Sequence, residues 1–88
     1  MHKNDLPQNY PNPFNSTTTI AFSIPKAGRY VLNIYNVNGE VVQTVLNKNF
    51  AAQFYSIDLD ANNLASGVYF YRLSGNGMLM TKKFILLK

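Results

Sequence analysis

The fold is decided by residues 29–46, which read RYVLNIYNVNGEVVQTVL. In the first half of this stretch the apolar side chains of Tyr30, Leu32 and Ile34 occupy alternate positions, which places them on one face of a β-strand. An Asn-Gly pair follows, and such a pair is a strong hairpin signal because both residues tolerate positive φ. We therefore expect an antiparallel hairpin here. Its two strands are residues 29–36 and 40–46.

The same alternation continues on both sides of the hairpin. Ile20, Phe22 and Ile24 alternate with smaller or polar residues, and Tyr55, Ile57 and Leu59 do so further on. Turn-forming residues separate these runs, including a Gly-Asn-Gly sequence that predicts a terminal hairpin. The further expected strands are residues 17–24, 53–59, 68–74 and 78–87. The expected connections are a turn at 25–28, a polar loop at 47–49, a long segment at 60–67 and a three-residue turn at 75–77. In the long segment, the side chain of Leu64 is expected to point inward.

The composition agrees with this pattern. Val, Ile, Thr, Tyr and Phe contribute 28 of the 88 residues, Glu occurs once, and Gly and Pro are spread between the apolar runs. Side chains of these types suit a pleated, half-buried surface. Six or seven short strands in a chain of this length predict an all-β domain, an immunoglobulin-like antiparallel β-sandwich, with a small barrel as the alternative.

The N-terminal stretch differs from the rest. Prolines at positions 7, 11 and 13 fix φ and remove backbone donors, so residues 6–16 are expected to form an extended lead-in that lies across the domain. Residues 1–5 are expected to be linker or added residues outside the domain. Within the lead-in we expect a clasp with Phe14 as its buried anchor; its members are Asn12, Pro13, Phe14 and Asn15.

Charge and cysteine content exclude several classes of protein. The chain carries 8 Lys and Arg against 4 Asp and Glu, a net charge of +4, but most of its cations are scattered. Only Lys82, Lys83 and Lys88 are close together, so the basic stripe of a nucleic-acid-binding protein is missing. No cysteine is present, no apolar run is long enough to span a membrane, and residues 1–5 lack the apolar segment of a signal peptide. Any export information is therefore expected elsewhere in this chain or in a larger parent protein.

Catalytic chemistry finds no support in the residues. The only histidine is His2, near the chain end, and Asp58 and Asp60 are the only acids close to each other. The segment 58–63 resembles a calcium loop only faintly, because it lacks the glycine at its sixth position and Tyr69 stands where the ligating glutamate would be. We expect its Asp and Asn side chains to bond to the backbone and start a turn. The sequence thus predicts a protein that is not an enzyme and needs no cofactor.

Tyr69 and Tyr71, which flank Phe70, allow two interpretations. Exposed tyrosines could form a platform on which sugars stack, as in carbohydrate-binding modules. Aromatic residues in strands more often form cross-strand pairs and core. A non-catalytic carbohydrate-binding module or a structural spacer of a secreted enzyme is therefore the alternative function.

Four blocks of the sequence, in order, resemble the type A C-terminal sorting domain of the type IX secretion system. The first contains the Pro-Asn-Pro-Phe-Asn lead-in, the second an Asn-Val-Asn-Gly-Glu turn, the third Leu-Ala-Ser-Gly-Val-Tyr, and the last begins with Lys-Lys and ends with Lys. One departure is Leu59, where many members carry Trp, which implies a smaller core there. Immunoglobulin-like domains of flagellar hook-capping proteins are similar more loosely. The blocks are residues 6–22, residues 25–30 together with 35–42, residues 64–73 and residues 82–88.

The resemblance implies an export signal at the end of a larger secreted protein of Bacteroidetes-type bacteria. Its expected partners are the outer-membrane translocon, a sortase-like peptidase that removes the domain, and the cargo domain that precedes it, with no nucleic acid and no direct membrane insertion. Its expected location is the periplasm in transit and then the cell surface or the medium. Residues 6–88 would form this sorting domain.

The resemblance also suggests which residues are recognised. Fixed positive charge on the last strand would guide a partner, while Phe84, Leu86 and Leu87 would anchor that strand in the core. Gly28 and Gly39 are expected to be structural, at turns where a side chain would strain the backbone. The candidate recognition residues are Lys82, Lys83, Lys88, Gly67 and Tyr69.

Overall fold

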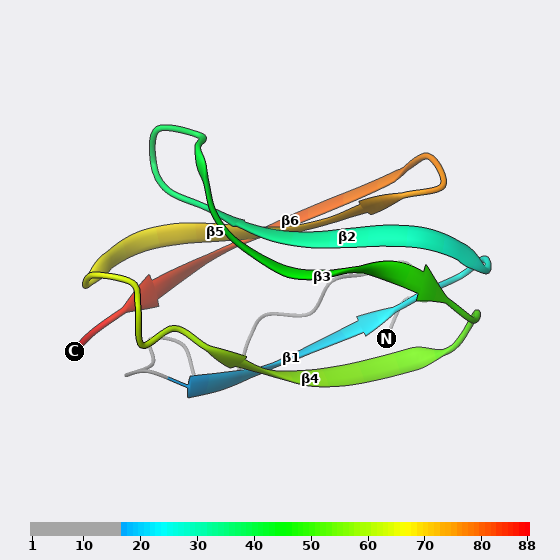
Figure 1. Cartoon of the computed structure of the whole chain (residues 1–88), viewed down its shortest axis with the longest axis horizontal. Helices are drawn as coiled ribbons and strands as arrows, with labels where there is room; N and C mark the ends of the chain where they lie inside the picture. Colours follow the sequence, from blue (N-terminus) through cyan, green and yellow to red (C-terminus); the bar gives the residue numbers. More distant parts are fainter. Residues whose placement is uncertain (1–16) are drawn as a thin grey trace.

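The computed structural model describes residues 17–88, which form six β-strands and contain no helix (Figure 1). The expected lead-in and its clasp, Asn12 to Asn15, lie outside the described residues. All strand pairs are antiparallel. The strands are β1 (Thr17–Ser23), β2 (Gly28–Tyr35), β3 (Val41–Phe50), β4 (Phe54–Asp60), β5 (Gly67–Gly75) and β6 (Met78–Leu86).

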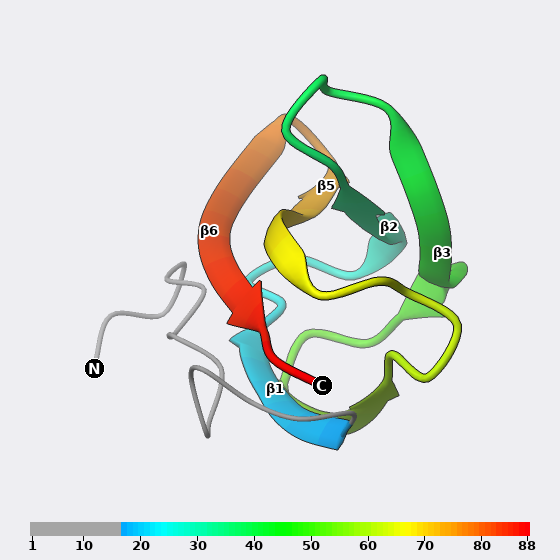
Figure 2. The same ribbon diagram turned by 90° about the vertical axis from the view of Figure 1, so that its left-hand side faces the viewer.

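The strands form two layers. A four-stranded sheet has the order β3-β2-β5-β6, and a two-stranded sheet pairs β1 with β4. Figure 2 shows the larger sheet curving over the smaller one, with β6 and β3 at its two sides. The prediction of an all-β sandwich with six or seven strands is confirmed. No helix in residues 17–88 could span a membrane.

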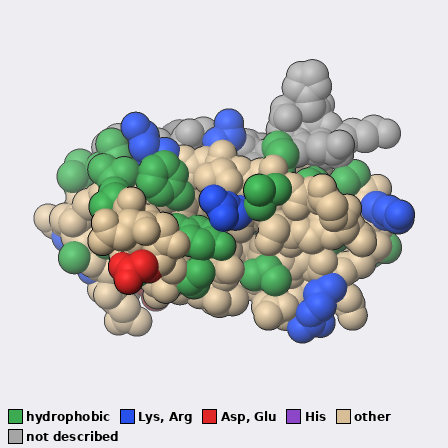
Figure 3. Space-filling view, turned by 90° about the horizontal axis from the view of Figure 1, so that it is seen from above, with side chains coloured by type: hydrophobic (Ala, Val, Ile, Leu, Met, Phe, Trp, Pro, Cys, Tyr) green, Lys and Arg blue, Asp and Glu red, His purple; other side chains and the backbone are tan. Residues whose placement is uncertain are grey.

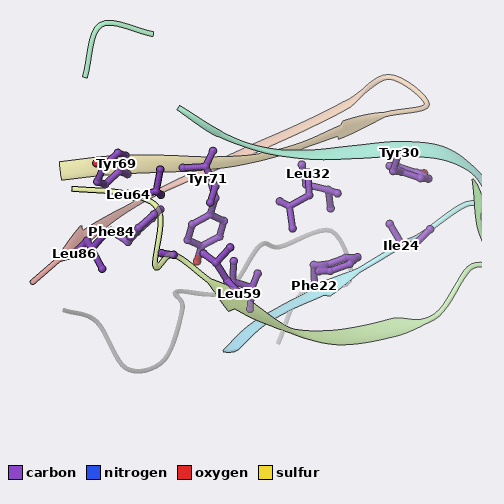
Figure 4. Packing of buried hydrophobic residues seen from close by; sticks show 14 of the residues in the cluster. Phe22, Ile24, Tyr30, Leu32, Leu59, Leu64, Tyr69, Tyr71, Phe84 and Leu86 are labelled. Carbon is purple, nitrogen blue, oxygen red and sulfur yellow. The ribbon is translucent and has the colours of Figure 1, made fainter. Parts of the chain in front are cut away.

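The core lies between the two layers (Figure 4). Alternate residues of β1, β2, β4, β5 and the end of β6 point into it, as the period of a half-buried strand requires. Leu59 is buried and lies in Figure 4 close to the ring of Tyr71. The largest fully buried side chains are Tyr30, Tyr71, Phe22, Phe84, Ile20, Leu32, Ile34, Leu59, Leu73 and Leu86.

The β2–β3 and β5–β6 hairpins are present as expected, but their turns have other lengths than the sequence predicts. The Asn-Gly pair at 38–39 lies in a longer loop, where the Asn36 side chain accepts hydrogen bonds from the backbone N–H groups of Asn38 and Glu40. Only Gly39 has positive φ there, at 82°. In the terminal hairpin Gly75 belongs to β5, so the expected three-residue turn is wrong. Its two central residues, Asn76 and Gly77, have φ of 48° and 76°, the tight turn that matches strand twist.

The expected polar loop at 47–49 is also wrong, because these residues continue β3. They pair with residues 29–31 of β2, and their side chains are exposed, where polar residues carry little penalty. Phe50 then anchors the strand end in the core. Its ring contacts those of Phe22 at 5.8 Å and Tyr55 at 4.9 Å between centroids, both edge to face. An inward aromatic residue therefore extends the strand through a stretch whose composition favours a loop.

Three tyrosines near the start of their strands make the same type of hydrogen bond to the preceding connection. The hydroxyl of each donates a hydrogen bond to the backbone carbonyl four residues earlier: Tyr30 to Lys26 at 2.7 Å, Tyr55 to Ala51 at 2.9 Å, and Tyr69 to Ala65 at 2.6 Å. Immunoglobulin-like domains use a similar tyrosine contact at a strand corner. Each contact fixes the connection before the strand, and the one at Tyr69 fixes the segment that the candidate site contains.

Candidate recognition site

The two adjacent lysines of β6 lie on opposite faces of the sheet. Lys82 is half-buried and pairs in register with Tyr71, which points into the core. Lys83 is exposed and pairs with Phe70, whose side chain points outward. Consecutive residues of a strand point to opposite faces. The structure therefore does not bring these two charges together on one surface.

Lys88 is held against the connection between β4 and β5. Its backbone N–H donates a hydrogen bond to Ser66 Oγ at 3.0 Å, and its Nζ donates to the carbonyl of Asn62 at 2.5 Å. Two donors from one residue thus fix the segment after β6. Phe84 and Leu86 anchor the strand itself in the core as expected, but Leu87 is 55% exposed, so its expected anchoring role is wrong.

The connection between β4 and β5 is ordered by its own residues. The Asp60 carboxylate accepts a hydrogen bond from the N–H of Asn62 at 3.0 Å, and the N–H of Leu64 donates to the carbonyl of Ala61 at 3.0 Å. The side chains of Ala61 and Leu64 are buried. The expected turn-starting bond and the inward position of Leu64 are both confirmed. This segment gives Lys88 a fixed partner.

Tyr69 and Gly67 lie at the start of β5, where the side chain of Tyr69 is buried beneath the candidate recognition surface. Tyr69 is only 8% exposed, and its ring stacks on that of Phe84 at 5.5 Å between centroids. A Cβ placed on Gly67 would lie 3.9 Å from Tyr69 Cε2, an ordinary contact, but the φ of 158° at Gly67 is one that other residues rarely adopt. Neither residue presents a group to a partner, so any part that they take in recognition is to position the chain.

The two glycines expected at turns have different surroundings. Gly39 has φ of 82° with open space around it, so the turn requires its left-handed backbone. A Cβ on Gly28 would collide with the side-chain amide of Asn76. That amide donates hydrogen bonds to the carbonyl of Ala27 at 3.0 Å and of Lys26 at 3.4 Å. Gly28 thus leaves space for a link between the β1–β2 and β5–β6 turns.

The prediction that Tyr69 and Tyr71 form an exposed platform for sugars is wrong. Tyr71 is fully buried and Tyr69 nearly so, and only Phe70 between them points outward. Sugar stacking needs an exposed ring face, which the two tyrosines do not offer. Their neighbour Phe84 contacts both rings, which makes them part of the core.

Acidic groups do not gather into a metal or catalytic site in residues 17–88. No three residues of the ligating types lie close enough to hold a metal ion. Asp58 and Asp60 share the outer face of β4, opposite Thr19 and Thr17 of β1. The carboxylate of Asp58 accepts a hydrogen bond from Thr19 Oγ1 at 3.0 Å, and that of Asp60 serves the turn.

Taken together, these observations define a small all-β module whose candidate residues position and present the last strand and the segment after it. The model of a protein family described as the secretion system C-terminal sorting domain matches residues 8–87. The chain belongs to this family, whose members are C-terminal secretion signals of the type IX system. Membership implies export across the outer membrane as part of a larger protein. Comparisons with curated proteins and with solved structures gave no significant match.

Proposed function

We propose that the type IX machinery recognises the folded sandwich together with β6 and the segment after it. The partners are the outer-membrane translocon and then a sortase-like peptidase, and the cargo domain precedes this domain in the parent chain. The protein would pass through the periplasm before it reaches the cell surface or the medium. Recognition of this kind uses no cofactor, no catalytic residue of the domain, no nucleic acid and no membrane insertion.

The observation that carries this proposal is the fixed position of the chain after β6. Lys88 bonds to both Ser66 and Asn62, while Phe84 and Leu86 are fully buried. A segment held at both ends loses little conformational freedom when a partner binds it. Lys83, exposed on the outer face, supplies positive charge beside this segment, and charge of this kind speeds the encounter with an acidic partner.

Export of a reporter tests the proposal. Residues 6–88 are fused behind a periplasmic reporter in a host that has the type IX machinery, and reporter activity is measured in the medium, on the cell surface and in the periplasm. We expect the intact fusion to leave the periplasm. Retention of the folded fusion in the periplasm would overturn the proposal and favour a spacer module.

Single lysine variants test which charges are recognised. Lys83→Gln and Lys88→Gln are expected to lower export several-fold, whereas Lys26→Gln, which removes an equal charge from the exposed β1–β2 turn, is the matched control. Thermal unfolding of each variant separates loss of recognition from loss of folding. Equal export from all three variants would show that charge at the end of the chain is not recognised.

A further inference from the structure

The outer face of the four-stranded sheet carries a hollow that the sorting proposal does not use. It has a volume of about 310 Å³ and lies where the β2–β3 loop meets the outward side chains of β5 and β6. Tyr35, Phe70, Arg72 and Thr81 line it from the strands, and Asn36, Val37 and Gly39 from the loop. Its lining therefore combines two aromatic rings and one valine with one guanidinium group and the polar side chains of Asn36 and Thr81.

The guanidinium of Arg72 is held in a defined orientation. Its Nε donates a hydrogen bond to Thr81 Oγ1 at 3.2 Å, and its Cζ lies 4.7 Å from the centroid of the Tyr35 ring. Within residues 17–88 no acidic side chain forms an ion pair with it. The two terminal amino groups of an arginine form a planar fork that matches the two oxygens of a carboxylate. Arg72 is thus set to bind an anion without further ordering.

The strands of the two outer faces differ in charge. Arg29, Arg72 and Lys83 belong to the outer face of the four-stranded sheet, whereas Asp58 and Asp60 lie on the outer face of β4, on the opposite side. The acidic group near the hollow is Glu40 of the β2–β3 loop, whose carboxylate accepts a hydrogen bond from the side chain of Asn36 at 2.8 Å. Figure 3, which looks onto the four-stranded sheet, shows blue side chains spread over it and a single acidic group near one end. The face around Arg72 is therefore complementary to a negatively charged partner.

The strand partners of Arg72 in register, Asn33 and Thr81, are polar, but exposed apolar side chains lie close to the hollow. Val37 is 67% and Val41 51% exposed, and Figure 3 shows hydrophobic side chains gathered at this end of the face. An exposed apolar patch of this kind marks an interaction surface. Nucleic acids and anionic membranes are bound by rows or clusters of cations. One guanidinium among valines and aromatic rings instead fits a carboxylate with apolar neighbours.

We propose that this hollow binds an extended segment of a protein partner in which an acidic side chain stands beside apolar ones. The carboxylate pairs with the terminal amino groups of Arg72, and the apolar neighbours lie on Phe70, Val37 and Val41. The proposal does not depend on the lysines at the end of the chain. A test with the purified chain is thus independent of the export assay.

Titration of the 88-residue chain by NMR tests the site, with an acetylated and amidated Val-Glu-Val-Glu-Val peptide as the probe. We expect saturable shifts of the amides of residues 35–39, 70–72 and 81. Arg72→Gln should weaken binding by about tenfold, because a hydrogen-bonded charge pair is lost. Arg72→Lys, which keeps the charge without the fork, should weaken it less. Arg29→Gln removes an equal charge from the same face and should leave the affinity unchanged.

The matched probe replaces each Glu by Gln, and we expect it not to bind. Equal binding of both peptides, or shifts that Arg72→Gln and Arg72→Lys leave unchanged, would overturn the proposal. Vesicles of anionic phospholipid provide the second comparison. Binding to vesicles without binding to the Val-Glu peptide would also overturn it, since the face would then recognise a membrane surface.

Discussion

The variant Tyr69→Phe, which removes a single hydroxyl group, should measurably lower the free energy of unfolding of the domain. The hydroxyl donates a partly buried hydrogen bond of 2.6 Å to the carbonyl of Ala65. The ring of Phe keeps the stack on Phe84, so the variant removes only the bond. Loss of a buried bond that leaves its acceptor unpaired costs about 1 to 2 kcal/mol. For a domain of this size the melting temperature should fall by roughly 5 to 15 °C.

Urea unfolding followed by circular dichroism measures this loss, and amide hydrogen exchange locates it. Exchange should accelerate in residues 61–66, because Tyr69 and Lys88 hold that connection from its two sides. Tyr55→Phe is the matched control, since its hydroxyl makes the same type of bond to Ala51 at 2.9 Å in an exposed setting. We expect this control to lose less than about 0.5 kcal/mol. An equal loss in both variants would refute the reasoning.

Three further changes test the core, a close approach and an unpaired polar atom, each by urea unfolding. Phe84→Ala should cost about 3 to 5 kcal/mol, because this fully buried ring contacts two tyrosine rings; a loss below about 1 kcal/mol would contradict the packing. Gly75→Ala should cost about 3 kcal/mol or more, since its φ is 153° and a Cβ would collide with the Arg29 carbonyl and lie 2.7 Å from Tyr30 Cδ2; a neutral result would contradict that contact. Asn33→Val should stabilise by about 1 kcal/mol, because Oδ1 of Asn33 is buried without a hydrogen-bond partner in the described chain; a loss of stability would show that the oxygen has one.

The fold could be predicted from the sequence because its core follows a strict period of two. Ile20, Phe22 and Ile24 in one run and Tyr30, Leu32 and Ile34 in another are all buried, as the alternation requires. The prediction of a loop from local composition was wrong. Residues 47–49 have the polar character of a loop, yet they stay in β3 because Phe50 beyond them packs into the core.

The turns show a similar limit. Asn-Gly pairs occur at 38–39 and at 76–77, and the sequence alone gives both the same preference for a tight turn. In the first loop, the side chain of Asn36 accepts hydrogen bonds from two backbone N–H groups, and this contact stabilises a longer loop. At the second pair Asn76 instead bonds across to the β1–β2 turn. A local side-chain contact thus lengthens the first loop, whereas a tertiary contact links the second turn to the β1–β2 turn.

The candidate site could be predicted only in part, because recognition depends on faces and partners across the sheet. The sequence indicated Lys83 and Lys88 but not the contact of Lys88 with the β4–β5 connection, 22 to 26 residues away. Nor did it reveal the hollow around Arg72. Three of its side chains, those of Tyr35, Arg72 and Thr81, come from three strands, and only the register of β2, β5 and β6 brings them together.

The separation of Lys82 and Lys83 limits how a single partner can use both. Lys83 faces outward, whereas Lys82 faces the core side of β6, where its methylene chain can cover apolar surface while its ammonium group reaches solvent. Within the described residues β6 forms one edge of its sheet. A partner that contacts both ammonium groups must therefore extend around that edge. A partner that lies flat on the outer face lies on the side of Lys83 and Arg72, and Lys82 is on the other side of the sheet.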